Sequence, residues 1–335
     1  MTDRRTKEPQ QPGAPRIAVL IPCYNEAATI GKVIADFQAA LPEAVIYVFD
    51  NNSADGTGEL ARAAGAVVIH EKKQGKGHVV AAMFEKVDAD YYLMVDGDDT
   101  YPARRARDLL APILAGRADM VVGRREALDR ETAYRRFHVL GNRLVRTMVN
   151  LIFRAKLTDI MSGYRAFTRE VADNLPVCAV GFDIETEMTV QCLYHRWVIQ
   201  EVPVEYGARP EGSESKLNTI QDGLRVIFKI LSLFRSYKPL TFFGGLAIAL
   251  FLVVVVLGVT VYVGKWQPDS GYRLSLTILA ATLTAMSLIA ASIGVIVQLI
   301  NFRFLELGSL LRRRRRGRDL GEELQNAEGS VRNNA

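Results

Sequence analysis

The sequence has few cysteines and lacks the common nucleotide-binding and zinc-protease signatures. Its three cysteines, Cys23, Cys178 and Cys192, are scattered without CxxC or Cys/His spacing. This spacing argues against a disulfide framework or a zinc site and favours a reducing, cytoplasm-facing compartment. G-x-G-x-x-G and H-E-x-x-H motifs are absent, and "QGKGH" lacks the upstream glycine and following Ser/Thr of a P-loop. The chain therefore carries no Walker motif.

Positive charge is placed unevenly along the chain. The net charge is +5 at pH 7, and "LLRRRRRGR" near the C-terminus supplies much of it. We expect no nucleic-acid partner. No signal peptide opens the chain, and residues 1–15 are polar and contain proline, which predicts a disordered leader.

Two long uncharged runs, Leu240–Val263 and Leu274–Ile300, follow the first two thirds of the chain. A bilayer core of ~30 Å needs ~20 apolar helical residues, so both runs are long enough to span it. The alternative, two buried helices of a soluble core, would need a larger surrounding domain than the remaining chain supplies. Residues 239–301 are therefore predicted to form a transmembrane hairpin. Basic residues flank it, Arg312–Arg316 among them, which predicts that both chain ends lie in the cytoplasm of a multi-pass membrane protein, with 302–335 as a basic tail.

Small residues recur in the second run at Thr277, Ala281 and Ala285. Such a stripe allows close helix packing, either within the hairpin or between subunits. A homo-oligomer is expected.

Residues 16–215 alternate strand-like and helix-like signals. Apolar runs such as "RIAVLIP", "AVIYVFD", "AVVIH", "YYLMVD" and "ADMVVG" are separated by amphipathic stretches. This alternation predicts βαβ units and an α/β fold with a mostly parallel sheet, in which ligands bind beyond the carboxyl ends of the strands. The polar residues that follow these predicted strands are Pro22, Tyr24, Glu26, residues 50–55 and residues 96–99.

The stretch "YYLMVDGDDTYP" places three aspartates at the end of an apolar run. In extended chain, Asp96 and Asp98 project to one side and Asp99 to the other. Two carboxylates on one side suit Mg²⁺ or Mn²⁺, with substrate phosphates completing the coordination. The alternative is a solvated turn in which Asp99 or Thr100 caps a helix that starts near Ala103. We favour the metal.

The motifs "IPCYNE", "DNNSADGT", "QGKG", "DGDDTY" and "DIMSGYRAF" occur in the order and spacing of family 2 glycosyltransferases, which the chain resembles. The resemblance implies the GT-A fold. The added "RPEGSESKL" and the two apolar runs are similar to polyprenyl-phosphate glycosyltransferases, a group that includes dolichyl-phosphate mannose synthases and bactoprenol glucosyltransferases. The resemblance covers nearly all of residues 16–300.

The resemblance also implies a nucleotide-sugar site. The residues that would hold the nucleotide in the first two loops are Pro22, Tyr24, Glu26, Asp50, Asn51, Ser53 and Asp55. Lys76, Asp96 and Gly97 would complete this site, and Asp96 and Asp98 would carry the metal that binds the diphosphate. Asn51 replaces one of the paired aspartates usual in the family, so the nucleobase stays open. Thr100 stands where dolichyl-phosphate mannose synthases have glutamine, so an outer metal ligand stays open too.

The acceptor side is expected to bind a lipid-linked phosphate. Arg125 falls where the family keeps a phosphate-binding arginine, and Arg209, Ser215 and Lys216 offer further donors. Asp159 matches the family's base or orienting acid. Glu185 in "GFDIETEM" is a second catalytic candidate.

Two basic amphipathic stretches predict contact with the lipid bilayer. Residues 216–238 run directly into the first apolar span, which favours an interfacial helix. Residues 134–153 show the same pattern, but a core-packed helix with a wet basic face explains it almost as well.

Together these features predict metal-dependent, inverting transfer of one hexose from a UDP- or GDP-hexose to undecaprenyl or dolichyl phosphate. Processive polysaccharide synthesis is rejected, because "QCLYHRW" fails the QxxRW spacing. Two alternatives stay open: an inactive nucleotide-sugar-binding membrane scaffold or sensor, and a glycosyltransferase with another lipid or polysaccharide acceptor.

Overall fold

The computed structural model describes residues 15–127, 134–176, 184–207, 231–232, 234–263 and 270–333. It divides into two units, residues 1–226 and 227–335. Nearly all of the predicted leader and most of the predicted helix at 216–238 lie outside the described residues.

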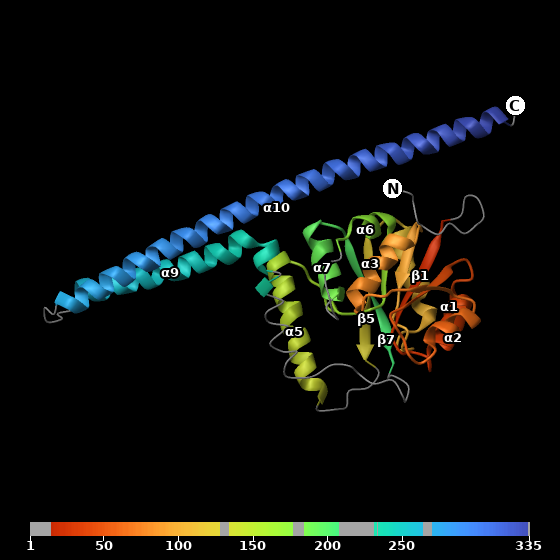
Figure 1. The fold of residues 1–335 in the computed structure, drawn as a ribbon, viewed down its shortest axis with the longest axis horizontal. Coiled ribbons are helices and arrows are strands. Elements are labelled where there is room, and N and C mark those ends of the chain that lie inside the picture. The colour runs from red at the N-terminus through yellow and green to blue at the C-terminus, as the bar shows by residue number, and fades with distance from the viewer. Residues whose placement is uncertain are drawn as a thin grey trace. The chain divides into compact units, whose positions relative to one another are not determined.

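The first unit is an α/β domain built on a seven-stranded sheet (Figure 1). Its strands are β1 Ile17–Cys23, β2 Val45–Asp50, β3 Val67–His70, β4 Tyr91–Met94, β5 Met120–Ala127, β6 Arg165–Thr168 and β7 Ile199–Tyr206. Its described helices are α1 Ile30–Ala40, α2 Thr57–Ala63, α3 Lys76–Lys86, η1 Ala103–Arg105, α4 Ala106–Leu114, α5 Tyr134–Phe153, α6 Arg169–Asn174 and α7 Ile184–Tyr194.

Helices cover both faces of the sheet because the central strands are apolar on both sides. Along β1, Val19 and Ile21 pack into a cluster with α1, α2 and α4, whereas Ala18 and Leu20 pack into a second cluster with α3, α6 and α7. Figure 1 shows these helices on either side of the strands. The core therefore lies in two layers, and the strand ends are left for polar residues.

The strand order is β3-β2-β1-β4-β6-β5-β7. Strands β3, β2, β1 and β4 run parallel, β6 runs antiparallel to both β4 and β5, and β7 is parallel to β5. The five predicted strands are confirmed, and so is the mostly parallel sheet. The sequence reading had not singled out β6 or β7. The antiparallel β6 brings the segment before it to the edge where the parallel strands end.

The second unit contains α9, Pro239–Val263, and α10, Ser270–Asn333, which pack along each other (Figure 1). Within them, Pro239–Thr260 and Leu274–Gly308 are long and apolar enough to cross a membrane, by length and composition. In the most apolar stretch of each helix, only 6% of residues in α9 and 17% in α10 are buried. This low burial argues against core helices of a soluble protein. Helix α10 continues through most of the predicted tail.

Close packing of α9 and α10 uses small residues. Ser287 Oγ donates to Ala247 O at 2.9 Å, and a Cβ at Gly294 would lie 3.0 Å from Phe243 Cβ. The predicted stripe at Thr277, Ala281 and Ala285 lies on the exposed face of α10 instead. The prediction that this stripe packs within the hairpin is therefore wrong. Packing of the stripe between subunits stays a prediction.

Candidate active site

The site lies where the chain order in the sheet reverses, between β1 and β4. Ligands of open α/β sheets bind beyond the carboxyl ends of strands at such a point. Strand β4 pairs with β6 so that Met94 lies opposite Arg165. The segment that precedes Arg165 therefore reaches the same edge as the acidic turn that follows β4.

Hydrogen bonds tie the loop after β1 to the loop after β2. Asn25 N donates to Ser53 Oγ at 3.0 Å, and Ala27 N donates to Asp55 Oδ2 at 3.0 Å. Burial acts to raise the pKa of Asp55, but hydrogen bonds from the Thr57 hydroxyl and backbone amides outweigh it and lower the pKa. Ser53 and Asp55 thus hold the two predicted nucleotide loops together.

Asn51 is buried, and its amide holds the next loop. Its Nδ2 donates to Glu71 O and Lys73 O, both at 2.8 Å, and its Oδ1 accepts from Gly75 N at 2.8 Å. Sequence reasoning expected this side chain to touch the nucleotide. The structure gives it contacts that shape the loop leading to Lys76.

The acidic turn is not extended. Strand β4 ends at Met94, and Asp99 has a positive φ of 58°. Asp98 is buried and accepts from Thr100 Oγ at 2.6 Å, while Asp99 pairs with Lys32 at 2.8 Å. The extended geometry expected for Asp96–Asp99 is therefore wrong.

The capping alternative is wrong as well. The residue at the N-terminal cap of η1 is Pro102, whose side chain makes no capping hydrogen bond. Thr100 and Asp99 instead bond to Asp98 and Lys32. The acidic turn is therefore not explained as a helix cap.

A lysine ammonium lies between two carboxylates of the site. Lys76 Nζ is 2.5 Å from Asp96 Oδ1 and 2.5 Å from Glu185 Oε1. Burial acts to lower the pKa of Lys76, but the charges and hydrogen bonds of both carboxylates outweigh it and raise the pKa. Gly163 lies against Asp96 so closely that a Cβ there would collide with the carboxylate.

These carboxylates could contribute to a site for a divalent cation. Asp96 and Glu185 already converge on one positive charge, and Asp98 is two residues from Asp96. Oxygen donors of this kind suit Mg²⁺ or Mn²⁺. Among the described residues, no group of three or more His, Cys, Asp and Glu side chains could hold a metal by itself. A cation here would need further oxygens, which a diphosphate supplies.

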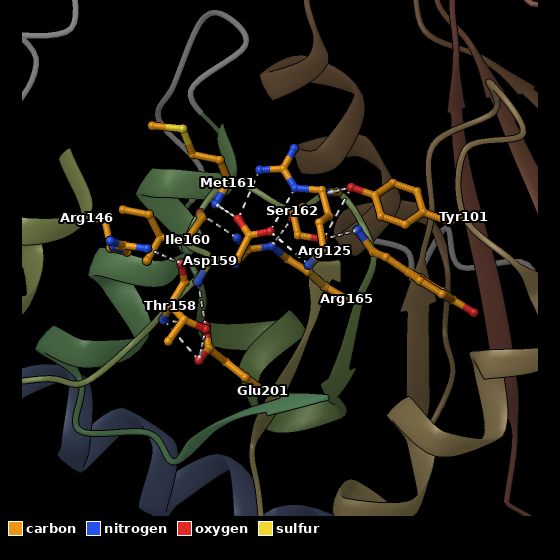
Figure 2. A network of polar contacts seen from close by, with 12 residues as sticks. Tyr101, Arg125, Arg146, Thr158, Asp159, Ile160, Met161, Ser162, Arg165 and Glu201 are labelled. Carbon is orange, nitrogen blue, oxygen red and sulfur yellow. Dashed lines mark hydrogen bonds and ion pairs between the residues drawn. The ribbon is translucent and has the colours of Figure 1, made fainter. Parts of the chain in front are cut away.

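On the other side of the site, Asp159 and Arg125 form an ion pair (Figure 2). Asp159 Oδ2 accepts from Arg125 Nε at 2.7 Å and from Arg125 N at 3.1 Å, and Oδ1 accepts from Arg125 Nη2 at 3.0 Å and from Met161 N at 3.1 Å. Burial acts to raise the pKa of Asp159, but the Arg125 bonds and charge outweigh it and lower the pKa. The Arg125 guanidinium also lies 5.5 Å from the Tyr206 ring centre.

Sequence reasoning missed two residues that hold this segment. Arg165 is fully buried and donates to Ile160 O and Ser162 O, both at 2.7 Å (Figure 2). Glu201 accepts from the backbone amides of Thr158 and Asp159. Arg165 lies in the motif "DIMSGYRAF", which could have drawn attention to it. Glu201 lies in "QEVPVEY", which contains no recognisable motif.

The structure thus brings the predicted residues into two groups. Lys76, Asp96 and Glu185 form one group, and Arg125 and Asp159 form the other. Tyr24 is exposed at the end of β1. The predicted phosphate donors Arg209, Ser215 and Lys216 lie outside the described residues.

Helix α5 has an apolar face that the domain covers only in part. Val145 and Val149 are buried, whereas Leu144 and Leu151 are 43% and 78% exposed. The predicted helix is confirmed. Its interfacial position stays a prediction.

Comparison with known proteins identifies the family. Residues 18–175 match the family model described as glycosyl transferase family 2. Glycosyltransferase AglJ of Haloferax volcanii is 38% identical over 252 residues, which are 75% of this chain and 82% of that protein. The chain belongs to glycosyltransferase family 2. The resemblance inferred from the motifs is confirmed, and the protein is an enzyme that transfers a glycosyl group.

Two further relatives add detail about the family. Dolichyl-phosphate hexose transferase of Haloferax volcanii is 30% identical over 210 residues, 63% of this chain and 90% of that one. Among solved structures, glucosyl-3-phosphoglycerate synthase from Mycobacterium tuberculosis, in complex with Mn²⁺ and UDP-glucose, matches with a TM-score of 0.55. It is 23% identical, and the match covers 65% of this chain and 79% of that one. The GT-A fold expected for a family 2 glycosyltransferase is confirmed.

Proposed function

We propose that this family 2 glycosyltransferase transfers one hexose from a nucleotide sugar to a membrane polyprenyl phosphate. The observation that carries the proposal is that one site holds both a cation, in the Arg125–Asp159 pair, and an acidic group that contains Asp96, with Tyr101 within electrostatic reach of Arg125 and Asp96. A phosphate acceptor needs the cation, and a metal-bound diphosphate donor needs the acids. The name of the relative that acts on dolichyl phosphate supports the acceptor class.

On the donor side, the loops after β1 and β2 would bind the nucleoside, with Tyr24 exposed beside them. Asp96 and Asp98 would hold Mg²⁺ or Mn²⁺. When bound, this cation neutralises charge that grows on the departing nucleoside diphosphate. Lys76 is close enough to Asp96 to add a second positive charge near the phosphates.

On the acceptor side, the chemistry needs positioning more than proton removal. A phosphate monoester has its second pKa near 6 and is largely dianionic at pH 7, so it is already a nucleophile. Asp159 has a lowered pKa and accepts four hydrogen bonds, which makes it a poor base. We therefore assign Asp159 to orienting Arg125, and Arg125 to binding the phosphate.

Attack by the acceptor phosphate would be a single in-line displacement. One displacement at the anomeric carbon inverts its configuration. The phosphate oxygen forms the new bond as the bond to the nucleoside diphosphate breaks, and positioning with charge neutralisation lowers the barrier.

The second unit would supply the membrane anchor. Helices α9 and α10 would cross the bilayer, with the catalytic domain and both chain ends in the cytoplasm. A lipid-linked acceptor would then be presented to the enzyme at the surface of the membrane in which the enzyme is anchored.

The test is product analysis with the full chain in detergent. Purified protein is incubated with Mg²⁺ or Mn²⁺, undecaprenyl or dolichyl phosphate, and a panel of UDP- and GDP-hexoses. We expect a glycolipid from one donor, its loss with EDTA, and its loss in Asp96→Asn. Donor binding without any lipid product would overturn the proposal and favour a nucleotide-sugar sensor or another acceptor.

A further inference from the structure

Glu201 on β7 holds the segment that carries Asp159. Glu201 Oε1 accepts from Thr158 N and from Asp159 N, both at 2.7 Å. Glu201 Oε2 accepts from Thr158 Oγ at 2.8 Å and from Thr158 N at 3.0 Å. Figure 2 shows the carboxylate beneath the turn, on the side away from Arg125.

Within the described part of the chain, the Glu201 carboxylate accepts hydrogen bonds from this turn alone. Glu201 forms no ion pair with any described residue, and each printed hydrogen bond it accepts comes from Thr158 or Asp159. The turn between α5 and β6 has no strand partner at Thr158 and Asp159, so their amides take the Glu201 carboxylate as acceptor instead. Glu201 therefore supplies the hydrogen-bond acceptors for Thr158 N and Asp159 N that a neighbouring strand would supply in a sheet.

Asp159 is thus held through both its backbone and its side chain. Its backbone amide is bound to Glu201, and its carboxylate is bound to Arg125. Within the described residues, Arg125 donates from Nε and Nη2 to Asp159 and makes no hydrogen bond from Nη1. The direction of the guanidinium edge that carries Nη1 therefore depends on the position of the Asp159 carboxylate, together with the Tyr206 ring 5.5 Å away.

We propose that Glu201 is a positioning residue that sets the Asp159–Arg125 pair for the acceptor phosphate. The inference rests on the proposed function, because it gives Arg125 a phosphate to bind. In this proposal Glu201 has no direct contact with substrate. It acts through the turn at Thr158, and misplacing the pair by a fraction of an ångström weakens binding of the anion.

The experiment compares three variants of the full chain in detergent. Glu201→Ala removes all four bonds. Glu201→Gln keeps Oε1, which accepts both backbone amides, but loses the charge and the Oε2 acceptor of Thr158, to whose hydroxyl the new amide group can donate instead. Glu205→Ala is the matched control, because Glu205 lies on the same strand and pairs with Arg105 and Arg104 instead of the turn. The readouts are the KM for polyprenyl phosphate, the KM for the nucleotide sugar, kcat and Tm.

We expect Glu201→Ala to raise the KM for polyprenyl phosphate roughly 10- to 100-fold, as loss of outer partners does at other sites, with the donor KM within about twofold. Glu201→Gln should restore most of the acceptor affinity, and Glu205→Ala should leave both KM values unchanged. A purely structural role predicts lower Tm with equal effects on both substrates, and that outcome overturns the inference. If wild-type protein makes no glycolipid, the proposed function fails first and the inference fails with it.

Discussion

At the scale of single residues, the charged groups of the site are held by partners of opposite charge. Lys76 lies between Asp96 and Glu185, and Arg125 is bound to Asp159. An unpaired charge at a partly buried site is costly, so each pair keeps its members charged and oriented before substrate arrives. The lowered pKa of Asp159 agrees with the orienting role proposed for it.

The contact between Gly163 and Asp96 leads to a residue-scale prediction. A Cβ at Gly163 would collide with the Asp96 carboxylate, although the backbone itself has no positive φ that would require glycine. Gly163→Ala should displace Asp96 and reduce metal-dependent turnover roughly 100-fold, the loss expected when a reacting group moves by about 1 Å. Turnover and Mn²⁺ affinity are the measurements.

Gly31→Ala is the matched control for this change. Gly31 lies within α1 and has no atom within 4 Å of the added carbon. Alanine should favour the helix by roughly 0.5–1 kcal/mol and leave turnover intact. Full activity in Gly163→Ala would show that the carboxylate of Asp96 need not stay where it lies.

At the scale of elements, a charged clamp joins three segments at the opposite edge of the sheet. Arg169 at the start of α6 binds Asp88 at 2.6 Å and Asp90 at 2.9 Å, and Arg16 before β1 binds Asp88 at 2.9 Å. The clamp thus ties β1, the entry to β4 and α6 together. It lies away from the strand ends that carry the site, so its effect should be on stability alone.

Arg169→Met should lower stability by about 1.5–3 kcal/mol, the value of hydrogen bonds to charged groups. For a domain of this size that is roughly 3–10 °C in Tm. Kinetic constants should not change. A loss of catalysis without a change in Tm would contradict this assignment.

The effect of Arg169→Met should depend on pH. Burial acts to raise the pKa values of Asp88 and Asp90, but bonds and charge from Arg16 and Arg169 outweigh it and lower both. Carboxyls with lowered folded pKa values stabilise the protein above their unfolded pKa of about 3.9, and this stabilisation is lost as pH falls through the folded values. The Tm gap between wild type and Arg169→Met should therefore hold from pH 7 to about 4 and shrink below it.

The strands show which parts of the fold can be predicted from the sequence. The five predicted strands are apolar runs that end in polar residues, a pattern set by burial on both faces. Strand β6 has four residues and begins with the buried Arg165, and β7 contains Pro203 and two glutamates, so neither shows that pattern.

The site can be predicted from the sequence only in part, because local sequence patterns do not reveal every contact. Asp96 and Asp159 stand in recognisable motifs, but Glu201 meets Asp159 across 42 positions of sequence. Local patterns carry no information about such a contact. The turn at Asp99 also depends on Lys32, which is 67 positions away.

At the scale of the whole molecule, two units of different composition make one chain. The first has a packed core and a polar strand edge, and the second exposes apolar side chains along α9 and α10. Exposed apolar surface of this extent marks contact with a membrane or another protein. The proposed bilayer insertion can be tested by which side of the membrane each end of α9 and α10 faces.

A cysteine-labelling experiment gives the whole-molecule prediction. Tyr262 near the end of α9 is 91% exposed, and Leu310 on α10 is 52% exposed. In sealed vesicles of known orientation, an impermeant thiol reagent should label Tyr262→Cys from outside the cell and Leu310→Cys only from the cytoplasmic side. Labelling of both positions from one side would exclude the proposed topology.

Wild-type protein gives the background for this labelling. Of the three cysteines, Cys178 lies outside the described residues, whereas Cys23 and Cys192 are buried, and burial raises the pKa of the Cys192 thiol to about 12. A thiol that stays protonated reacts slowly, because the thiolate is the nucleophile.

The turn before β6 has a further consequence for hydrogen exchange. Six backbone amides in it donate to side chains and not to a neighbouring strand: Leu157, Thr158, Asp159, Met161, Gly163 and Tyr164. Amide protons exchange with solvent deuterium only when such bonds open, so a segment without regular secondary structure should exchange as slowly as a strand. Its exchange rate would then report how often the acceptor half of the site comes apart in the resting enzyme.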